Sequence, residues 1–353
     1  MPRAAVALVL IGALVSAAVA AGVTLTILQL QSRTNPQVVN LGSKVTLTED
    51  SAVQQVATRA LPAVVSIVTD ERGQSYGSGF TVTTDGYIVT NLAVVANSGT
   101  LTVLLPNDSH RRDARIVDFD CQTGVAVLKV DQVSNLPTLT FGDSSQLRIG
   151  QTVVALGGPY GTLAFAKGEV GSLHRATTIA GNVPRSSATY ADTLQTDAVV
   201  DTGNSGGPVL NVAGQVVGIS VALLNGGQQS SFALASNDVQ PAVQQIVQGG
   251  QLVVPDLGVE TQDLSVEDAA LRGLPVGSLV TAVTAGSPAE AAGLRVGDVI
   301  TQLDDNRLDA GHPLTQVLRA HYRPDQRATV TFTRGSGSIS TQATLRGVHP
   351  PCR

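Results

Sequence analysis

The chain of 353 residues has little of what several large protein classes depend on. It has two cysteines, Cys121 and Cys352, which are too few for a disulfide scaffold and lack the CxxC spacing of a zinc site. It has no tryptophan, and aromatic residues make up only 3% of the sequence, so it offers no platform for stacked bases. We therefore expect no metal, no cofactor and no redox chemistry.

Charged residues are also scarce, at 14% against a usual share of about 25%, whereas apolar residues reach 43%. This composition excludes a disordered chain and predicts a sizeable hydrophobic core. The net charge is −5, and basic residues form no long run that could follow a phosphate backbone. Nucleic acid is therefore not an expected partner, and the length allows two ordinary domains.

The N-terminal segment is the one long apolar run. Residues 4–30 carry no charge, and as a helix they would rise about 40 Å, enough to cross a hydrocarbon core of about 30 Å. A cleaved signal peptide is the competing interpretation, because Ala18-Val19-Ala20 fits a small-residue cleavage site. A buried helix of a soluble fold is a third. Because the apolar run continues past that site, we favour an uncleaved transmembrane anchor over residues 1–30, with Arg3 inside and the rest extracytoplasmic.

After a polar linker over residues 31–50, turn residues divide the chain into a short helix and many short β-branched runs. We expect Asp50 or Ser51 to cap the first helix, which Pro62 ends. The predicted strands fall into two groups of six, which predicts a mainly β fold with paired barrels. They are 63–69, 79–83, 87–90, 101–105, 114–119 and 125–130, then 152–156, 169–173, 193–196, 208–211, 215–221 and 231–235.

A closing helix, capped by Ser236 or Asn237, should end this first domain, which we place at residues 51–250. Gly249-Gly250 and Pro255 mark the boundary. A smaller α+β unit is predicted over residues 256–347, followed by a tail over 348–353. Cys121 and Cys352 can form a bridge in an oxidising compartment, although the sequence does not establish that they reach each other.

A glycine-rich loop around Ser205 carries the first sign of chemistry. Glycines on both sides of a serine let the backbone turn tightly and expose the hydroxyl. They also allow the amides of Gly203 and Ser205, with Asn204 between them, to form an oxyanion hole. A glycine turn that serves only the shape of the barrel is the plainer alternative.

Several motifs in order resemble the HtrA (DegP-like) family of trypsin-like serine proteases. They are Gly77-Ser78-Gly79-Phe80, Asp85-Gly86-Tyr87-Ile88-Val89-Thr90-Asn91, Ala126-Val127-Leu128-Lys129-Val130 and the loop from Thr196 to Pro208. Further on, residues 287–300 resemble the PDZ domain that follows such proteases. The resemblance implies a double six-stranded barrel of trypsin type followed by a PDZ domain. It also implies that trimers are possible.

Two positions depart from that family. The histidine that acts as general base is replaced by Ala93, and the aspartate that orients it is replaced by Gly124. Ser205 alone remains of the three, and a serine without a base is a weak nucleophile. His110 and His174 are the only histidines in the protease-like region, and we expect neither to reach Ser205. If the rest of the site is intact, Ala93→His with Gly124→Asp should restore activity.

The PDZ-like unit offers a peptide-binding site by resemblance. Leu257-Gly258-Val259 is the expected carboxylate-binding loop, along which a partner's C-terminal segment would add as a strand. A helix over 312–321 would border the groove, with Leu314, Val317 and Leu318 in its floor or in the core. Asp256 stands where family members often carry an aromatic residue, and its carboxylate is expected to repel a peptide C terminus.

The sequence therefore predicts a membrane-anchored, extracytoplasmic pseudoprotease that binds polypeptides or peptide C termini, as a scaffold, chaperone-like holder or regulator. The alternative is an active serine endopeptidase that uses Ser205 with a non-standard base or inside a mixed oligomer.

Overall fold

The computed structural model describes residues 49–350, except for 71–73, 97–98, 107, 109, 159–162, 180–187, 199–202 and 226–227. The predicted anchor (1–30), most of the linker (31–50), and Cys352 lie outside the described residues. No helix among the described residues is long and apolar enough to cross a membrane.

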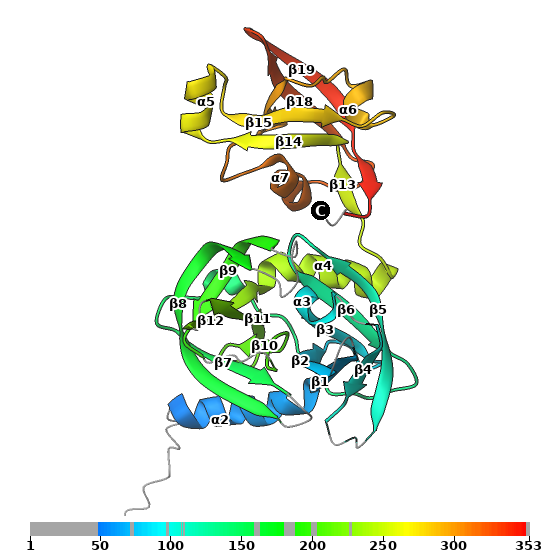
Figure 1. The fold of residues 1–353 in the computed structure, drawn as a ribbon, viewed down its shortest axis with the longest axis vertical. Coiled ribbons are helices and arrows are strands. Elements are labelled where there is room, and N and C mark those ends of the chain that lie inside the picture. Colours follow the sequence, from blue (N-terminus) through cyan, green and yellow to red (C-terminus); the bar gives the residue numbers. More distant parts are fainter. Residues whose placement is uncertain are drawn as a thin grey trace, which may run out of the picture. The chain divides into compact units, whose positions relative to one another are not determined.

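The first six strands close into a barrel in the order β1-β2-β3-β6-β5-β4, as predicted (Figure 1). Four of its interior side chains, Ile67, Ile88, Val103 and Leu128, are fully buried. Their alternation with residues on the outer face is the period of two that a strand imposes. The strands are β1 (Val64–Asp70), β2 (Gln74–Thr81), β3 (Tyr87–Asn91), β4 (Leu101–Leu104), β5 (Arg111–Asp120) and β6 (Val125–Val130).

The next six strands form a second closed barrel in the order β10-β11-β12-β9-β8-β7. Its predicted strands are confirmed, although β8, β9, β11 and β12 run beyond the predicted bounds. Hairpin partners extend each other because each added hydrogen-bonded pair of residues contributes two ladder hydrogen bonds. The strands are β7 (Thr152–Gly157), β8 (Ala164–Ile179), β9 (Ala188–Thr196), β10 (Pro208–Leu210), β11 (Val216–Asn225) and β12 (Gln228–Ala235).

Five short helical segments accompany the barrels in the described part of the chain: α2 (Glu49–Ala60), η1 (Leu61–Ala63), α3 (Leu92–Val95), η2 (Ser144–Gln146) and α4 (Ser236–Gly249). The predicted side-chain cap of α4 is wrong, because its N-cap is Ala235 and makes no side-chain hydrogen bond. Ser236 Oγ instead donates to the carbonyl of Gly142, and Asn237 Nδ2 donates to Asp143. Both side chains therefore tie α4 to the segment before the second barrel.

The C-terminal unit is an antiparallel sheet with the order β14-β15-β16-β18-β19, in which β17 pairs with β16. Strands β13 and β20 form a separate two-stranded ladder. The strands are β13 (Val254–Asp256), β14 (Val259–Leu264), β15 (Gly277–Val283), β16 (Val299–Leu303), β17 (Asn306–Arg307), β18 (Arg327–Arg334), β19 (Gly337–Thr344) and β20 (Arg346–Val348).

Helices α5 (Val266–Arg272), α6 (Pro288–Ala291) and α7 (Leu314–His321) complete this unit. The predicted groove helix corresponds to α7. Its apolar residues Leu314, Val317 and Leu318 are all buried in the core of the unit, together with Leu257 and Tyr322. Of the two roles expected for them, the structure supports the core.

Candidate functional site

Ser205 lies in a tight turn just before β10 and is almost completely buried, with 9% of its surface exposed. The backbone of this turn is fixed from both barrels. Ser78 of β2 donates from its amide to the Ser205 carbonyl (2.8 Å) and from Oγ to the Gly203 carbonyl (2.7 Å). The Asn204 carbonyl accepts from Gly207 N and from Ser220 Oγ. The loop is therefore rigidly held, while its role as an oxyanion hole stays a prediction.

The hydroxyl of Ser205 receives a hydrogen bond from an amide side chain. Asn91 Nδ2, at the end of β3, lies 2.7 Å from Ser205 Oγ and also donates to the Ser220 carbonyl at 2.9 Å. Asn91 Oδ1 caps α3 by accepting from Val94 N. A carboxamide N–H can only donate, so this contact occupies a lone pair of the hydroxyl and cannot accept its proton.

The predicted base and acid positions belong to two segments that contact each other. Ala93 is exposed on α3, one turn of helix that begins directly after Asn91. The amide of Leu92, its neighbour, donates to the carbonyl of Gly124 at 2.7 Å. Asn91 thus contacts Ser205 and Leu92 contacts Gly124, while Ala93, the predicted base position, carries only a methyl group.

The acid position is closed by a tyrosine. Gly124 has φ +75°, and a β-carbon added to it would lie 2.3 Å from Cε1 and 2.7 Å from Cζ of Tyr190 in β9. The Tyr190 side chain is buried, which raises the pKa of its phenol above the usual value. An aspartate at position 124 would therefore meet both an unfavourable backbone angle and a neutral aromatic ring. The expectation that two substitutions restore the site is not supported by this geometry.

Among the side chains that the structure describes, three histidines contact aspartates. His110 Nδ1 lies 3.5 Å from Asp108 before β5, His312 Nδ1 lies 3.0 Å from Asp309, and His349 Nε2 lies 2.8 Å from Asp118. The side chain of His174 lies outside what the structure describes. His110 is strongly exposed, with 86% of its side chain accessible.

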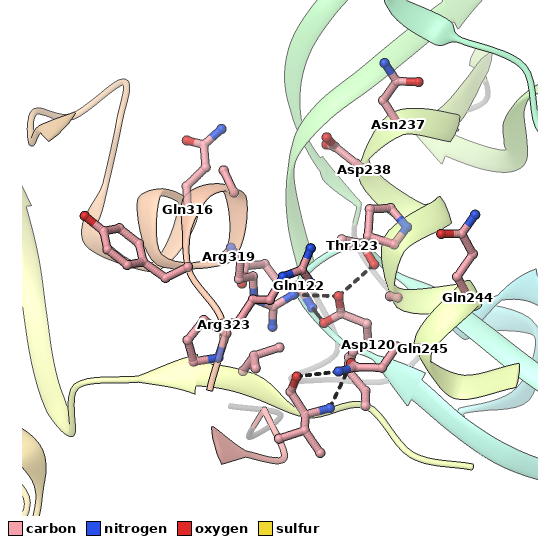
Figure 2. A pocket seen from close by; sticks show the side chains of 18 of the residues that line it. Asp120, Gln122, Thr123, Asn237, Asp238, Gln244, Gln245, Gln316, Arg319 and Arg323 are labelled. Atoms are coloured by element: carbon pink, nitrogen blue, oxygen red, sulfur yellow. Dashed lines mark hydrogen bonds and ion pairs between the residues drawn. The ribbon is translucent and has the colours of Figure 1, made fainter. Parts of the chain in front are cut away.

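The loop that carries Gly124 is anchored by a buried carboxylate. Asp120 accepts from Thr123 Oγ1, from the amide of Gln122 and, at 2.6 Å, from Arg319 of α7 (Figure 2). A cavity of about 680 Å³ lies beside this loop and is lined by residues of α4 and α7. Cys121, next to Asp120, is disulfide-bonded. These ties hold the acid-position loop in place independently of a catalytic triad.

The predicted carboxylate-binding loop is held by backbone hydrogen bonds, and its role in binding stays a prediction. Leu257 and Gly258 direct their carbonyls inward, where they accept from Ala289 N and Thr284 N at 2.9 Å each. Gly258 has φ +82°, and a β-carbon there would collide with Ser287. Only glycine fits this position. The following strand, β14, is the outermost strand of its sheet within the described part of the chain.

The predicted repulsion between Asp256 and a peptide C terminus is offset by an ion pair with Arg346. Asp256 Oδ2 lies 2.8 Å from both Nε and Nη2 of Arg346, so its charge is neutralised. No local sequence pattern indicates this pair, because the two residues lie 90 positions apart. Asn91, Ser78 and Tyr190 were missed for the same reason. A motif shows which residues a loop contains, but not which distant side chains fill the space around it.

Comparisons with known proteins agree with this architecture. Residues 77–219 match the trypsin-like peptidase domain family, and residues 255–345 match the PDZ domain family. The chain is 38% identical over 280 residues to a probable periplasmic serine endoprotease DegP-like from Chlamydia muridarum (strain MoPn / Nigg). That match covers 78% of this chain and 54% of the relative, so the chain spans about half the length of the curated relatives it matches.

Two solved structures of an HtrA-type protease, AlgW, share the fold across nearly their whole length. AlgW with a decapeptide is 28% identical with a TM-score of 0.71, and covers 85% of this chain and 99% of its own. AlgW with a tripeptide is 30% identical with a TM-score of 0.68, and the corresponding shares are 85% and 98%. With two trypsin-type barrels, a serine loop in the family position and a C-terminal PDZ domain, the chain belongs to the HtrA family of serine proteases.

Proposed function

We propose that this HtrA-family chain is a pseudoprotease that binds polypeptides without cleaving them. The observation that carries the proposal is the contact at the acid position, where the ring of Tyr190 occupies the space that a side chain on residue 124 would need. Alanine at the base position agrees with it. A missing aspartate alone could be an isolated substitution. Here, however, the backbone angle of residue 124 and its packing against an aromatic ring both differ from what an aspartate needs.

The expected loss of activity is large. A serine hydroxyl needs a base to take its proton, and loss of a triad in a related design lowers the rate by about 10⁶. Asn91 donates to Ser205 Oγ and offers that oxygen no basic group. An oxyanion hole and substrate binding alone leave about 10³ to 10⁴ over water, too little for useful cleavage of stable peptide bonds.

Peptide binding is supported by the outer edge of β14 and by the inward-facing carbonyls of Leu257 and Gly258. An outermost strand presents backbone groups with which an extended peptide can pair. The AlgW structures are described with a decapeptide and with a tripeptide. By this similarity, the ligand of the present chain is a peptide C terminus. The periplasmic relatives and the anchor predicted over residues 1–30 support attachment to the outer side of a membrane.

The direct test is covalent labelling. We expect the full chain to show no labelling by a serine-reactive phosphonate above that of Ser205→Ala, and no cleavage of an unfolded protein. An active relative such as the DegP-like protease serves as the positive control. Labelling or cleavage that Ser205→Ala abolishes would support the alternative, an endopeptidase with an unforeseen base.

A series of reversion variants tests the contact between position 124 and Tyr190. Ala93→His with Gly124→Asp is expected to remain inactive and to unfold at lower denaturant concentration than the wild type, because the new side chain meets Tyr190. Adding Tyr190→Ala should recover part of the lost stability by making room. Activity of the double variant with Tyr190 in place would contradict the proposed closure.

A further inference from the structure

An ion pair is built into the backbone ladder next to the carboxylate-binding loop. Asp256 of β13 and Arg346 of β20 are directly opposite each other in the antiparallel register. Such cross-strand pairs of opposite charge are held by the strands themselves. Asp256 Oδ2 contacts both Nε and Nη2 of Arg346 at 2.8 Å. The pair uses two of the five N–H groups of the guanidinium, so its remaining three are directed elsewhere.

The guanidinium lies against Gly258. Arg346 Nη2 is 3.4 Å from the position that a β-carbon on Gly258 would occupy. The arginine is partly exposed, with 38% of its side chain accessible, so its charge is open to a ligand as well as to Asp256. A positive group at this place is therefore set beside the backbone that is expected to receive a peptide carboxylate.

The amides of the loop point away from the interior. The Leu257 and Gly258 carbonyls accept from Ala289 N and Thr284 N, and in a trans peptide the following N–H points the opposite way. Val259 and Val283 are register partners, and the bond from Thr284 N to the Gly258 carbonyl makes them a non-hydrogen-bonded pair. The N–H of Val259 is thus directed to the outer edge of β14, where an added strand would begin.

From this geometry we infer that Arg346 is a specificity-determining residue that recognises the terminal carboxylate of a bound peptide. Asp256, which takes the place of an aromatic residue, holds the guanidinium beside Gly258. The inference rests on the proposed peptide-binding function and names one determinant of it. A guanidinium forms charge-assisted hydrogen bonds with a carboxylate, whereas a peptide amide at the same place offers no charge. The site should therefore discriminate free from amidated C termini.

The test compares two pools of decapeptides with four randomised C-terminal positions, one with free carboxylates and one with carboxamides. Retention of each pool by the full chain is measured for the wild type, Arg346→Gln, Arg346→Lys and Asp256→Asn. We expect the wild type to retain the carboxylate pool on the order of tenfold better. Arg346→Gln should reduce this ratio to near one, and Arg346→Lys should keep part of it. Asp256→Asn should keep part of the preference, because the guanidinium charge remains and an asparagine Oδ1 can still accept a hydrogen bond from it.

The outcomes separate the two proposals. If the wild type retains neither pool, peptide-terminus binding is wrong and this inference falls with it. If the wild type and Arg346→Gln prefer carboxylates equally, only the role of Arg346 is wrong. If Asp256→Asn loses the preference as completely as Arg346→Gln, Arg346 acts only by holding the loop through the ion pair, which also overturns the inference. Thermal unfolding of each variant shows whether the domain is folded.

Discussion

At the scale of single residues, Gly124 combines a left-handed backbone with a close aromatic neighbour, and the two effects can be measured separately. Gly124→Ala should lower the free energy of unfolding by about 2–5 kcal/mol, from about 1–2 kcal/mol of backbone strain and about 1–3 kcal/mol of overpacking. Gly150 is the matched control, because it has φ +80° with nothing within 4 Å of an added β-carbon. Gly150→Ala should show the strain alone in urea denaturation. Equal losses of stability at the two positions would mean that the Tyr190 side chain moves aside without cost, so that overpacking contributes nothing.

Two buried serines of the first barrel offer a second comparison. Ser78 Oγ donates to the Gly203 carbonyl at 2.7 Å and accepts from Gly158 N at 2.9 Å, so it connects the barrels beside the serine loop. Ser78→Ala leaves both groups without this partner and should cost about 1–3 kcal/mol. Ser66 Oγ is equally buried but has no hydrogen-bond partner among the described residues. Ser66→Ala should therefore be neutral or stabilising by the same denaturation assay.

At the scale of elements, α7 is tied to the sheet of the PDZ domain by a tyrosine. Tyr322 Oη donates to Asp304 Oδ2 at 2.9 Å, and Asp304 Oδ1 accepts from Thr329 N of β18. Burial and the hydrogen bond to Asp304 raise the pKa of Tyr322 to about 12. Tyr322→Phe should cost about 1 kcal/mol at pH 7, because a partly exposed hydrogen bond is lost.

The same tyrosine gives a pH dependence with a defined sign. In the unfolded chain a tyrosine loses its proton near pH 10, whereas in the fold Tyr322 keeps it to about pH 12. Its contribution is therefore complete below pH 10 and is lost as the pH rises from 10 through 12. Tyr322→Phe should remove that part of the alkaline loss of stability in a denaturation series from pH 8 to 12. The remaining part includes Tyr190, whose pKa burial also raises.

Most elements could be predicted from the sequence, because strands and turns leave local patterns. Strand β6 was predicted with its observed bounds, Val125–Val130, and the hairpin at Asp85-Gly86 joins β2 to β3. The start of α4 was predicted one or two residues too late, and its cap was wrong. Whether Asn237 caps its own helix or bonds Asp143 depends on where the segment before the second barrel lies. Local propensity carries no information on that choice.

The site could be predicted only as far as its motifs extend. The positions of Ser205, Ala93 and Gly124 followed from their places in ordered motifs, and the fold brings these segments together. The filling of the acid position by Tyr190 and the pairing of Asp256 with Arg346 could not, because each joins segments from different strands. In both cases the effect of the residue at position 124 or 256 depends on a neighbour that only the structure identifies.

At the scale of the whole molecule, Asp118 of β5 joins three distant segments. Its Oδ2 accepts from the amide of Leu252 at 2.6 Å, and its Oδ1 lies 2.8 Å from His349 Nε2. Leu252 is 3% exposed, so Asp118→Ala leaves a buried donor and should cost about 1–3 kcal/mol. His349→Ala, which keeps the Leu252 bond, should cost less. Hydrogen exchange at the Leu252 amide should accelerate in Asp118→Ala but not in His349→Ala.

The close packing of Gly124 and Tyr190 limits the sequences that lie within reach of this one. A carboxylate at position 124 requires a different backbone angle and a smaller residue at position 190, and an imidazole at position 93 has nothing to orient it until both are present. Each of these steps taken alone is either harmful or without benefit. If the chain is the pseudoprotease proposed above, random mutation would have to pass through less stable intermediates before a peptidase emerged from it.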